Sequence, residues 1–176
     1  MKTLSHIQIT PSVTIMNEKV ISNSGINGIY REFIGDYPKF FKMDPLCKLG
    51  VVAAELLLKD RVAEEKENAS IILFNRNGSL ITDRKYQKTI SDENYFPSPA
   101  LFVYTLANIV TGEIAIRNKI YGETSFYILS HQDEDVMDEV VKNTFLTSNP
   151  SFILTGWVDY DDEEHYLADM KLVNQL

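Results

Sequence analysis

The chain has 176 residues, of which 44% are hydrophobic and 11% aromatic, as expected for one globular domain and not for a mainly disordered chain. Its 17 basic and 25 acidic residues give a formal charge of -8, which disfavours nucleic-acid binding because that needs clustered Lys and Arg. The single cysteine, Cys47, excludes an internal disulfide and a cysteine-based zinc site. The sequence contains no run of 18 apolar residues, so it predicts no membrane-spanning helix. Apolar and polar residues alternate at the N-terminus, whereas a signal peptide has a continuous apolar block. We therefore expect a single cytoplasmic domain over residues 1–176, with no metal and no cofactor.

The first part of the chain predicts two short strands, a long helix and a buried strand. Apolar residues alternate over residues 7–15 on both sides of Pro11, which separates two strands. Asp44-Pro45 supplies an N-cap and a first helical residue. Apolar residues then recur around the whole circumference over residues 46–58, which predicts a mostly buried helix. The β-branched and aromatic run over residues 69–74 predicts a buried strand.

The second part of the chain continues the alternation of helices with strands. We expect a polar loop with one helical turn (79–94), followed by a helix that Ser98-Pro99 opens and that ends near Val110, with Gly112 as breaker or close-packing point. The remaining expected elements are a strand (124–129), a helix (131–145), a strand (152–158), an acidic turn (159–164) and a short last segment (166–173). Buried strands that alternate with helices are typical of an α/β layered fold with a mostly parallel sheet.

The helix expected over residues 131–145 carries a single apolar stripe. Val136, Met137, Val140, Val141 and Phe145 share one side, and carboxylates occupy the rest. Burying those carboxylates without partners would cost several kcal/mol each. We therefore expect one face of this helix to be in water.

Four segments resemble, in their order and spacing, the N-terminal half of the β-ketoacyl synthases. They are Tyr37-Pro38-Lys39-Phe40-Phe41-Lys42-Met43-Asp44 with the helix through Leu58, the stretch Pro97 to Asn108, Ile114-Ala115-Ile116 with Tyr121-Gly122, and Phe152 to Val158 with Thr155-Gly156-Trp157. The resemblance spans about residues 7–160. It implies one half of a thiolase-like fold, a mixed, mostly parallel five-stranded sheet with helices packed on it.

The resemblance also shows which catalytic parts are missing. In the family the reactive cysteine follows the glycine matched by Gly122 by nine residues, and this chain has His131 there. Condensation through a thioester needs a thiolate at a helix N-terminus, and Cys47 lies far upstream, inside the apolar helix. The resemblance covers only the first half of the fold, so we expect this chain to lack the second half, which supplies the family's pair of catalytic histidines or their His/Asn equivalent. We therefore expect no catalytic residues and no condensing activity.

Some relatives of synthases lack the cysteine and pair with an active synthase to shape chain length. By resemblance, we expect an auxiliary protein of fatty-acid, polyketide or aryl-polyene-type biosynthesis. In the family the strand before the nucleophile pairs with its copy across a dimer axis, so we expect residues 124–129 to form a homodimer or a heterodimer with an active ketosynthase. Two basic clusters either dock an acidic acyl carrier protein or are scattered surface charge. They are Arg84, Lys85 and Lys88, and Arg117 with Lys119.

Two other functions remain open. His131, with a carboxylate of Asp133 to Asp135 or one across a dimer interface, would serve decarboxylation or thioester hydrolysis. Alternatively the chain is an acyl-chain binding module, for which the expected lining residues are Phe102, Leu106, Phe126 and Ile128.

Overall fold

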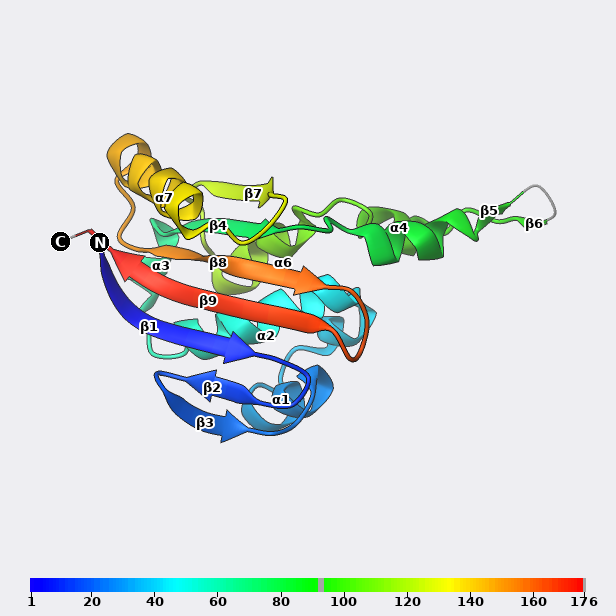
Figure 1. The fold of residues 1–176 in the computed structure, drawn as a ribbon, viewed down its shortest axis with the longest axis horizontal. Coiled ribbons are helices and arrows are strands. Elements are labelled where there is room, and N and C mark those ends of the chain that lie inside the picture. Colours follow the sequence, from blue (N-terminus) through cyan, green and yellow to red (C-terminus); the bar gives the residue numbers. More distant parts are fainter. Residues whose placement is uncertain (92–93, 176) are drawn as a thin grey trace.

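The computed structural model describes residues 1–91 and 94–175, and its centre is one seven-stranded sheet (Figure 1). The strands lie in the order β3 (Lys19–Ser22), β2 (Thr14–Met16), β1 (Lys2–Ile9), β9 (Tyr166–Asn174), β8 (Ile153–Tyr160), β4 (Ser70–Asn75) and β7 (Thr124–Ile128). Strands β8, β4 and β7 run parallel, while all other neighbours in this sheet are antiparallel.

The predicted five-stranded, mostly parallel sheet is therefore wrong, although the α/β class is confirmed. The extra strands come from hairpins, which join antiparallel neighbours without a crossover helix. Strand β9, expected only as a short segment, pairs with β8 over its full length and with β1 on its other side. Strand β3 follows β2 through Asn17 and Glu18, which have φ of 48° and 67°. Left-handed backbone at both positions suits a tight hairpin turn.

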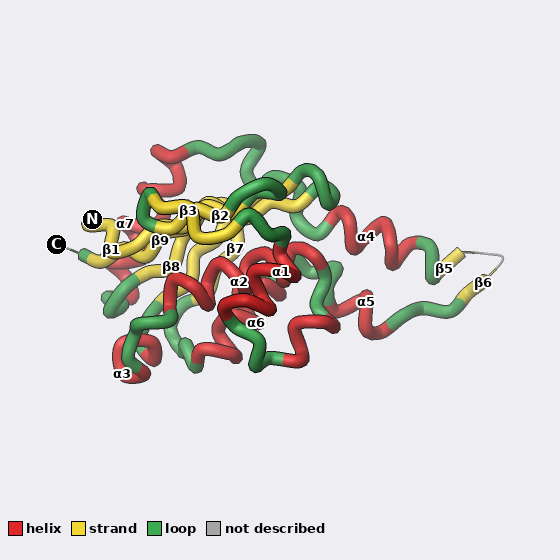
Figure 2. Tube along the Cα trace, turned by 90° about the horizontal axis from the view of Figure 1, so that it is seen from below, coloured by secondary structure: helices red, strands yellow, loops and turns green. Residues whose placement is uncertain are grey.

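Helices cover the two faces of the sheet unequally (Figures 1 and 2). Helices α2 (Pro45–Leu58) and α6 (Ile109–Asn118) lie on one face, and α7 (Glu134–Ser148) packs on the other over β8 and β4. The predicted helix at 45–58 is confirmed, with Asp44 capping it by accepting a hydrogen bond from the Cys47 N–H at 2.9 Å.

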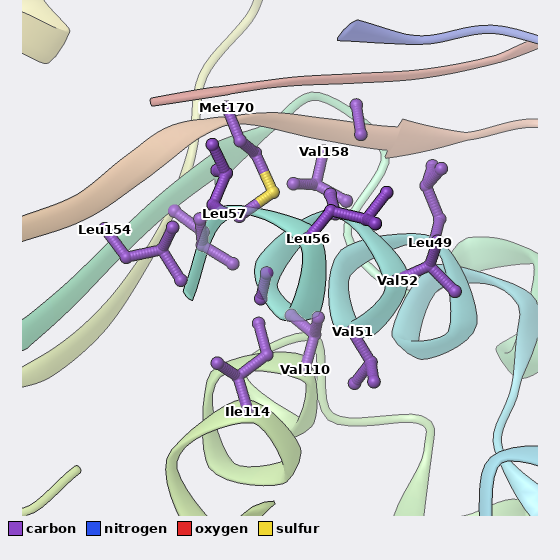
Figure 3. Close-up of a cluster of buried hydrophobic side chains, with 14 of the residues drawn as sticks. Leu49, Val51, Val52, Leu56, Leu57, Val110, Ile114, Leu154, Val158 and Met170 are labelled. Atoms are coloured by element: carbon purple, nitrogen blue, oxygen red, sulfur yellow. The ribbon is translucent and has the colours of Figure 1, made fainter. Parts of the chain in front are cut away.

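The core lies between α2, α6 and the sheet (Figure 3). Leu57, Val158 and Met170 meet there, and Val110 and Ile114 pack from α6. A Cβ on Gly50 would lie 2.4 Å from the Val110 side chain, so this glycine lets α2 and α6 approach closely.

Two short helices were not predicted: α1 (Ile26–Phe33) and η1 (Pro38–Lys42). The long helix was expected to run out in charged residues through Glu67, but α2 ends at Leu58 and a separate helix, α3 (Ala63–Glu67), follows it. A signal for α1 was available, because Ile26, Ile29, Tyr30 and Phe33 have the i, i+3, i+4, i+7 spacing of an amphipathic helix. Tyr30 and Phe40 stack at 3.9 Å between ring centroids, which joins α1 to η1.

An arm projects from the body of the molecule (Figures 1 and 2). The arm comprises α4 (Leu80–Gln87), the short strands β5 (Ile90–Ser91) and β6 (Asn94–Tyr95), and α5 (Pro99–Val103). Its two limbs meet where the Tyr86 and Phe102 rings lie 5.5 Å apart. Half of the stretch predicted as a polar loop with one helical turn is thus helical, in α4, and residues 92–93 of it lie outside the described part of the chain.

The helix predicted from Ser98-Pro99 to Val110 is also wrong. The backbone turns after Val103, and a separate helix, α6, begins at Ile109 and runs through Gly112. The turn places the Tyr104 hydroxyl 3.2 Å from the buried carboxylate of Glu113. Gly112 is therefore neither a break nor a close-packing point, since a Cβ there would have nothing within 4 Å.

Helix α7 has a single buried stripe, as its sequence predicts, but Val136, which was expected to belong to that stripe, is 40% exposed. Met137, Val141 and Phe145 are buried, whereas Glu134 and Leu146 are exposed. The strands expected at 69–74, 124–129 and 152–158 are confirmed within two residues at each end. Over the described residues, none of the helices has the length and apolar character needed to cross a membrane.

Candidate functional site at the carboxyl edge of the parallel strands

Three chain segments meet where the parallel strands end. Because β4, β7 and β8 run in the same direction, the segments that follow them lie at one edge of the sheet. In α/β sheets this edge is the usual place for a ligand. Two hollows lie here, a pocket of about 350 Å³ and a groove of about 720 Å³.

The pocket brings together two histidines that lie far apart in the sequence. It is lined by Arg76, His131, Gln132, Trp157, Asp159, Asp161, His165, Tyr166 and Leu167. The side chain of His131 is 73% exposed, and its Nε2 atom lies 3.8 Å from the Asp133 carboxylate. Its Nδ1 atom lies 2.9 Å from the Ser130 hydroxyl oxygen. An imidazole in water beside a carboxylate at that distance is weakly held, which does not favour its use as a general base.

The carboxylates of the pocket tie its loops together. Asp159 accepts hydrogen bonds from the backbone N–H of Asn77 at 3.3 Å and from its side-chain amide at 3.2 Å. Burial raises the pKa of Asp159, and the neighbouring Asp161 carboxylate adds to that rise. Arg76 pairs with Asp161 at 3.6 Å. The pocket thus joins the β4–α4 connection to the β8–β9 turn.

His165 and His6 each contact a different carboxylate. His165 Nδ1 lies 2.9 Å from a carboxylate oxygen of Asp162. The pKa of Asp162 is lowered mainly by the hydrogen bond it accepts from the Glu164 N–H, and secondarily by His165. His6 lies 2.6 Å from the Asp169 carboxylate, between β1 and β9. In the described part of the chain, no three His, Cys, Asp or Glu side chains are grouped to hold a metal ion.

The groove runs beside β7, which is the last strand of the sheet. It is lined by Asn77, Gly78, Ser79, Leu80, Asp83, Thr105, Leu106, Ala107, Asn108 and the residues of β7. Of the four residues expected to line an acyl site, Leu106, Phe126 and Ile128 lie in this groove. Phe102 does not line it, because its ring packs on Tyr86 in the arm and is 54% exposed.

Cys47 lies in the first turn of α2 and is 3% exposed. Burial raises the pKa of its thiol well above the usual range, and the Asp44 carboxylate adds to the effect. Both effects disfavour a thiolate, so Cys47 does not have the electrostatic environment of a nucleophile.

The basic residues do not gather into one patch. Arg117 is held by Asp36 at 2.6 Å and by Glu55 at 3.3 Å. Lys119 ends α6 with a left-handed φ of 55°. Arg84, Lys85 and Lys88 lie on or just after α4, in the arm.

Sequence reasoning missed a buried ionic cluster at the base of the arm. Lys39 donates to the Glu113 carboxylate at 2.6 Å, and the Glu113 side chain is only 6% exposed. The Tyr104 hydroxyl donates to the other oxygen of the same carboxylate. The available signal was a glutamate between Val110 and Ile114, on the apolar side of a helix.

Comparison with known proteins identifies the fold. No protein-family model matches the chain, and no curated protein is significantly similar in sequence. The ketosynthase ApeO in complex with its chain length factor ApeC from Xenorhabdus doucetiae matches with a TM-score of 0.71 and 13% identity, over 99% of this chain and 78% of that chain. The ishigamide ketosynthase/chain length factor matches with a TM-score of 0.74 and 16% identity, over 98% of this chain and 61% of that chain. At these identities the shared property is the fold: this chain has the α/β fold of the matched ketosynthase and chain length factor structures, over 78% and 61% of those chains.

Proposed function

We propose that this chain is an auxiliary ketosynthase-like subunit, which pairs with an active ketosynthase in the cytoplasm in fatty-acid, polyketide or aryl-polyene-type biosynthesis. The observation that carries the proposal is the start of α7. Thioester condensation needs a thiolate at a helix N-terminus, and here the chain carries His131, Gln132 and Asp133 before that helix. The single cysteine is buried in α2.

Strand β7 offers a route to the partner. Within the described residues it pairs with β4 on one side and with no strand on the other. Tyr127 is 38% exposed and Ile128 is 60% exposed. A free strand edge with exposed apolar side chains favours pairing with a strand of another chain. The two matched structures, a ketosynthase in complex with its chain length factor and a ketosynthase/chain length factor, support a ketosynthase as that chain.

The exposed outer face of α7 supports the proposal that no second half of the fold covers this helix. In the complete fold the equivalent helix lies between two sheets, whereas here Asp135 and Glu139 are exposed on its outer face. Covering unpaired carboxylates would be costly. The ketosynthase therefore docks at β7 and leaves α7 in water.

The experiment is a tagged pull-down from the native cell, followed by reconstitution. We expect a ketosynthase to be recovered in an amount near that of this chain. We also expect an acyl carrier protein, which would dock on the basic residues of α4. The isolated ketosynthase is then assayed with carrier and malonyl thioester, with and without this chain, and product lengths are measured. The proposal requires a changed length distribution, and the same distribution with the His131→Ala variant.

A pair of matched variants tests whether the ketosynthase binds at the β7 edge of the sheet. Ile128→Lys, on β7, should abolish pairing, whereas Val20→Lys, an equally exposed residue on the opposite edge strand β3, should not. If His131→Ala instead removes turnover that the chain shows alone on malonyl or acyl thioesters, the chain is an enzyme and the proposal is wrong.

A second candidate function is binding of an acyl chain in the groove. It is favoured by the convergence of Leu106, Phe126 and Ile128 on one hollow of about 720 Å³. Native mass spectrometry of the protein purified from its own cell should then show a retained lipid. Leu106→Glu should release the lipid, and its absence from the parent protein would exclude this function.

A further inference from the structure

A further cavity, of about 450 Å³, lies between the beginning of α1, the beginning of α2 and the β8–β9 turn. It is lined by residues 25–28 at the start of α1, by Pro45 and Lys48 of α2, and by Tyr160 and Tyr166 at the two ends of the turn. Small-molecule sites have volumes of roughly 300–1,000 Å³, so this cavity can hold a small ligand. Among the described residues that line it, none belongs to β7, the strand edge assigned above to the ketosynthase.

Lys48 brings a positive charge to this cavity. The residue is half-buried in the first turn of α2. Its Nζ atom lies 5.6 Å from the centroid of the Phe40 ring, a cation–π contact that orients the side chain. Within residues 1–91 and 94–175, no carboxylate oxygen lies within 4.0 Å of this ammonium group. An ammonium without a carboxylate partner is available to an anionic group of a ligand.

Glu163 brings a negative charge to the same cavity from the β8–β9 turn. The turn is closed by a hydrogen bond that the Asp161 N–H donates to the His165 carbonyl oxygen at 2.9 Å, which positions the backbone that carries Glu163. In the described part of the chain, Glu163 forms no ion pair and therefore does not neutralise Lys48. The cavity thus carries two opposite charges that lie further apart than the 4.0 Å limit of an ion pair.

Two stacked tyrosine rings form one wall of the cavity. The ring centroids of Tyr160 and Tyr166 are 5.6 Å apart, and the ring planes differ by 9°. Burial raises the pKa of both phenols, and the Glu163 carboxylate raises both pKa values further, so both rings stay neutral at physiological pH. The face of a neutral tyrosine ring attracts an ammonium group. The wall near Glu163 therefore suits the positive end of a ligand.

From these observations we infer that the cavity binds a small zwitterion, namely a free α-amino acid with an apolar side chain. Its carboxylate pairs with Lys48, and its ammonium lies against Glu163 and the tyrosine rings. Pro11 and Pro45, which also line the cavity, contact the apolar side chain. A ligand with a single charge would leave either Lys48 or Glu163 unpaired in a partly dehydrated site, which costs free energy. This inference goes beyond the proposed function and does not rest on it.

The test is isothermal titration calorimetry of the purified full chain with the apolar L-amino acids, from valine to phenylalanine, at up to millimolar concentration. The amino acid that binds most tightly is then compared with its N-acetyl derivative, which lacks the positive charge, and with its methyl ester, which lacks the negative charge. Each derivative should bind about tenfold more weakly or worse, because each loses one charge-assisted contact. The inference is overturned if none of the amino acids binds, or if either derivative binds as tightly as the free amino acid.

Two variants assign each charge of the ligand to its partner. Lys48→Met should no longer distinguish the free amino acid from its methyl ester, and Glu163→Gln should no longer distinguish it from its N-acetyl derivative. The matched controls are Lys42→Met and Glu164→Gln, which remove exposed charges that do not line the cavity and should leave every affinity unchanged.

Glu163→Gln also protects the test against a misfolded variant. Glu163 lies in an exposed turn, whereas Lys48→Met loses the contact with Phe40. Amino-acid binding by Glu163→Gln with the selectivity of the parent would place the ligand elsewhere and overturn the inference. None of these results affects pairing with a ketosynthase at β7, which is measured separately.

Discussion

The carboxylate of Asp44 accepts a hydrogen bond from the Thr82 hydroxyl at 2.7 Å, and its other oxygen accepts one from the Cys47 N–H at 2.9 Å. One buried side chain therefore both begins α2, the central helix of the core, and fixes α4 at the base of the arm. The residue was expected as a helix cap, and the tertiary structure gives it this second partner.

We predict that Asp44→Ala destabilises the protein by about 1–3 kcal/mol, because it removes the helix cap and leaves the buried Thr82 hydroxyl without an acceptor. Asp44→Asn keeps a capping oxygen and should lose less. Urea unfolding followed by far-UV circular dichroism measures both. Equal losses for the two variants would show that the contact with Thr82, not the cap, accounts for the effect.

Gly156 and Gly112 should respond oppositely to the same substitution. Gly156 has a φ of 147°, and a Cβ there would lie 2.1 Å from the Asp169 carbonyl oxygen of the neighbouring strand. Gly156→Ala should cost about 3 kcal/mol or more, or prevent folding. Gly112→Ala, in open space on α6, should stabilise by about 0.5–1 kcal/mol through helix propensity. Thermal melting measures the stability of both variants, and a destabilised Gly112→Ala would contradict the open space that a Cβ at this position would have.

Tyr104 should make the protein less stable at alkaline pH. Burial raises the pKa of its phenol, and the adjacent Glu113 carboxylate raises it further. The folded chain therefore keeps a proton that the unfolded chain loses near pH 10. The stabilisation is complete below that pH and is lost as the pH rises toward the folded-state pKa. Between pH 8 and 11, the urea midpoint of Tyr104→Phe should fall less steeply than that of the parent.

The control for this measurement is Tyr121→Phe, whose side chain is 75% exposed. Its pH dependence should match the parent. Burial also raises the pKa of Tyr160 and Tyr166, but both residues are present in every variant, so the difference between variants isolates Tyr104. Equal slopes for Tyr104→Phe and the parent would refute the prediction.

Adjacent residues on α7 test whether its outer face is in water. Phe145 is 3% exposed and packs under the helix, and Leu146 is 75% exposed. Phe145→Ala should cost about 3–5 kcal/mol. Leu146→Lys should change stability by less than about 0.5 kcal/mol. Chemical unfolding measures both, and a large loss for Leu146→Lys would show that another surface covers this face.

The elements that the sequence predicted well carry their own local signals. Helix α2 has a cap, a proline and an apolar run interrupted only by Lys48, Gly50 and Glu55, and β4 is a run of mostly β-branched and other apolar residues ended by a turn. The break between α5 and α6 has no such signal. Tyr104 leaves the helical path to reach Glu113, a residue nine positions further along the chain. Helix α4 has no apolar stripe and depends on contacts with Asp44 and Phe102, which are remote in sequence.

Three of the four residues expected to line an acyl site lie along one groove, and the exception, Phe102, has a physical cause. Leu106, Phe126 and Ile128 share the groove because α6 returns the chain to the edge strand β7. Phe102 belongs to the arm, and its partner Tyr86 lies in a stretch whose polar sequence predicted a loop. The sequence also could not predict that His131 and His165 line the same pocket, because their proximity depends on how β4, β7 and β8 are arranged in the sheet.

Composition, periodicity and capping residues by themselves determined that this chain folds as α/β layers. They also determined that α2 and β4 are buried and that one face of α7 is exposed to solvent, because each of these features follows from side chains that lie a few residues apart. Only the tertiary structure decided that the sheet has seven strands, that β7 is its edge, and that Asp159, His131 and His165 share a pocket. These features arise from contacts between residues distant in sequence, whose free energy depends on packing and strand register rather than on local preference.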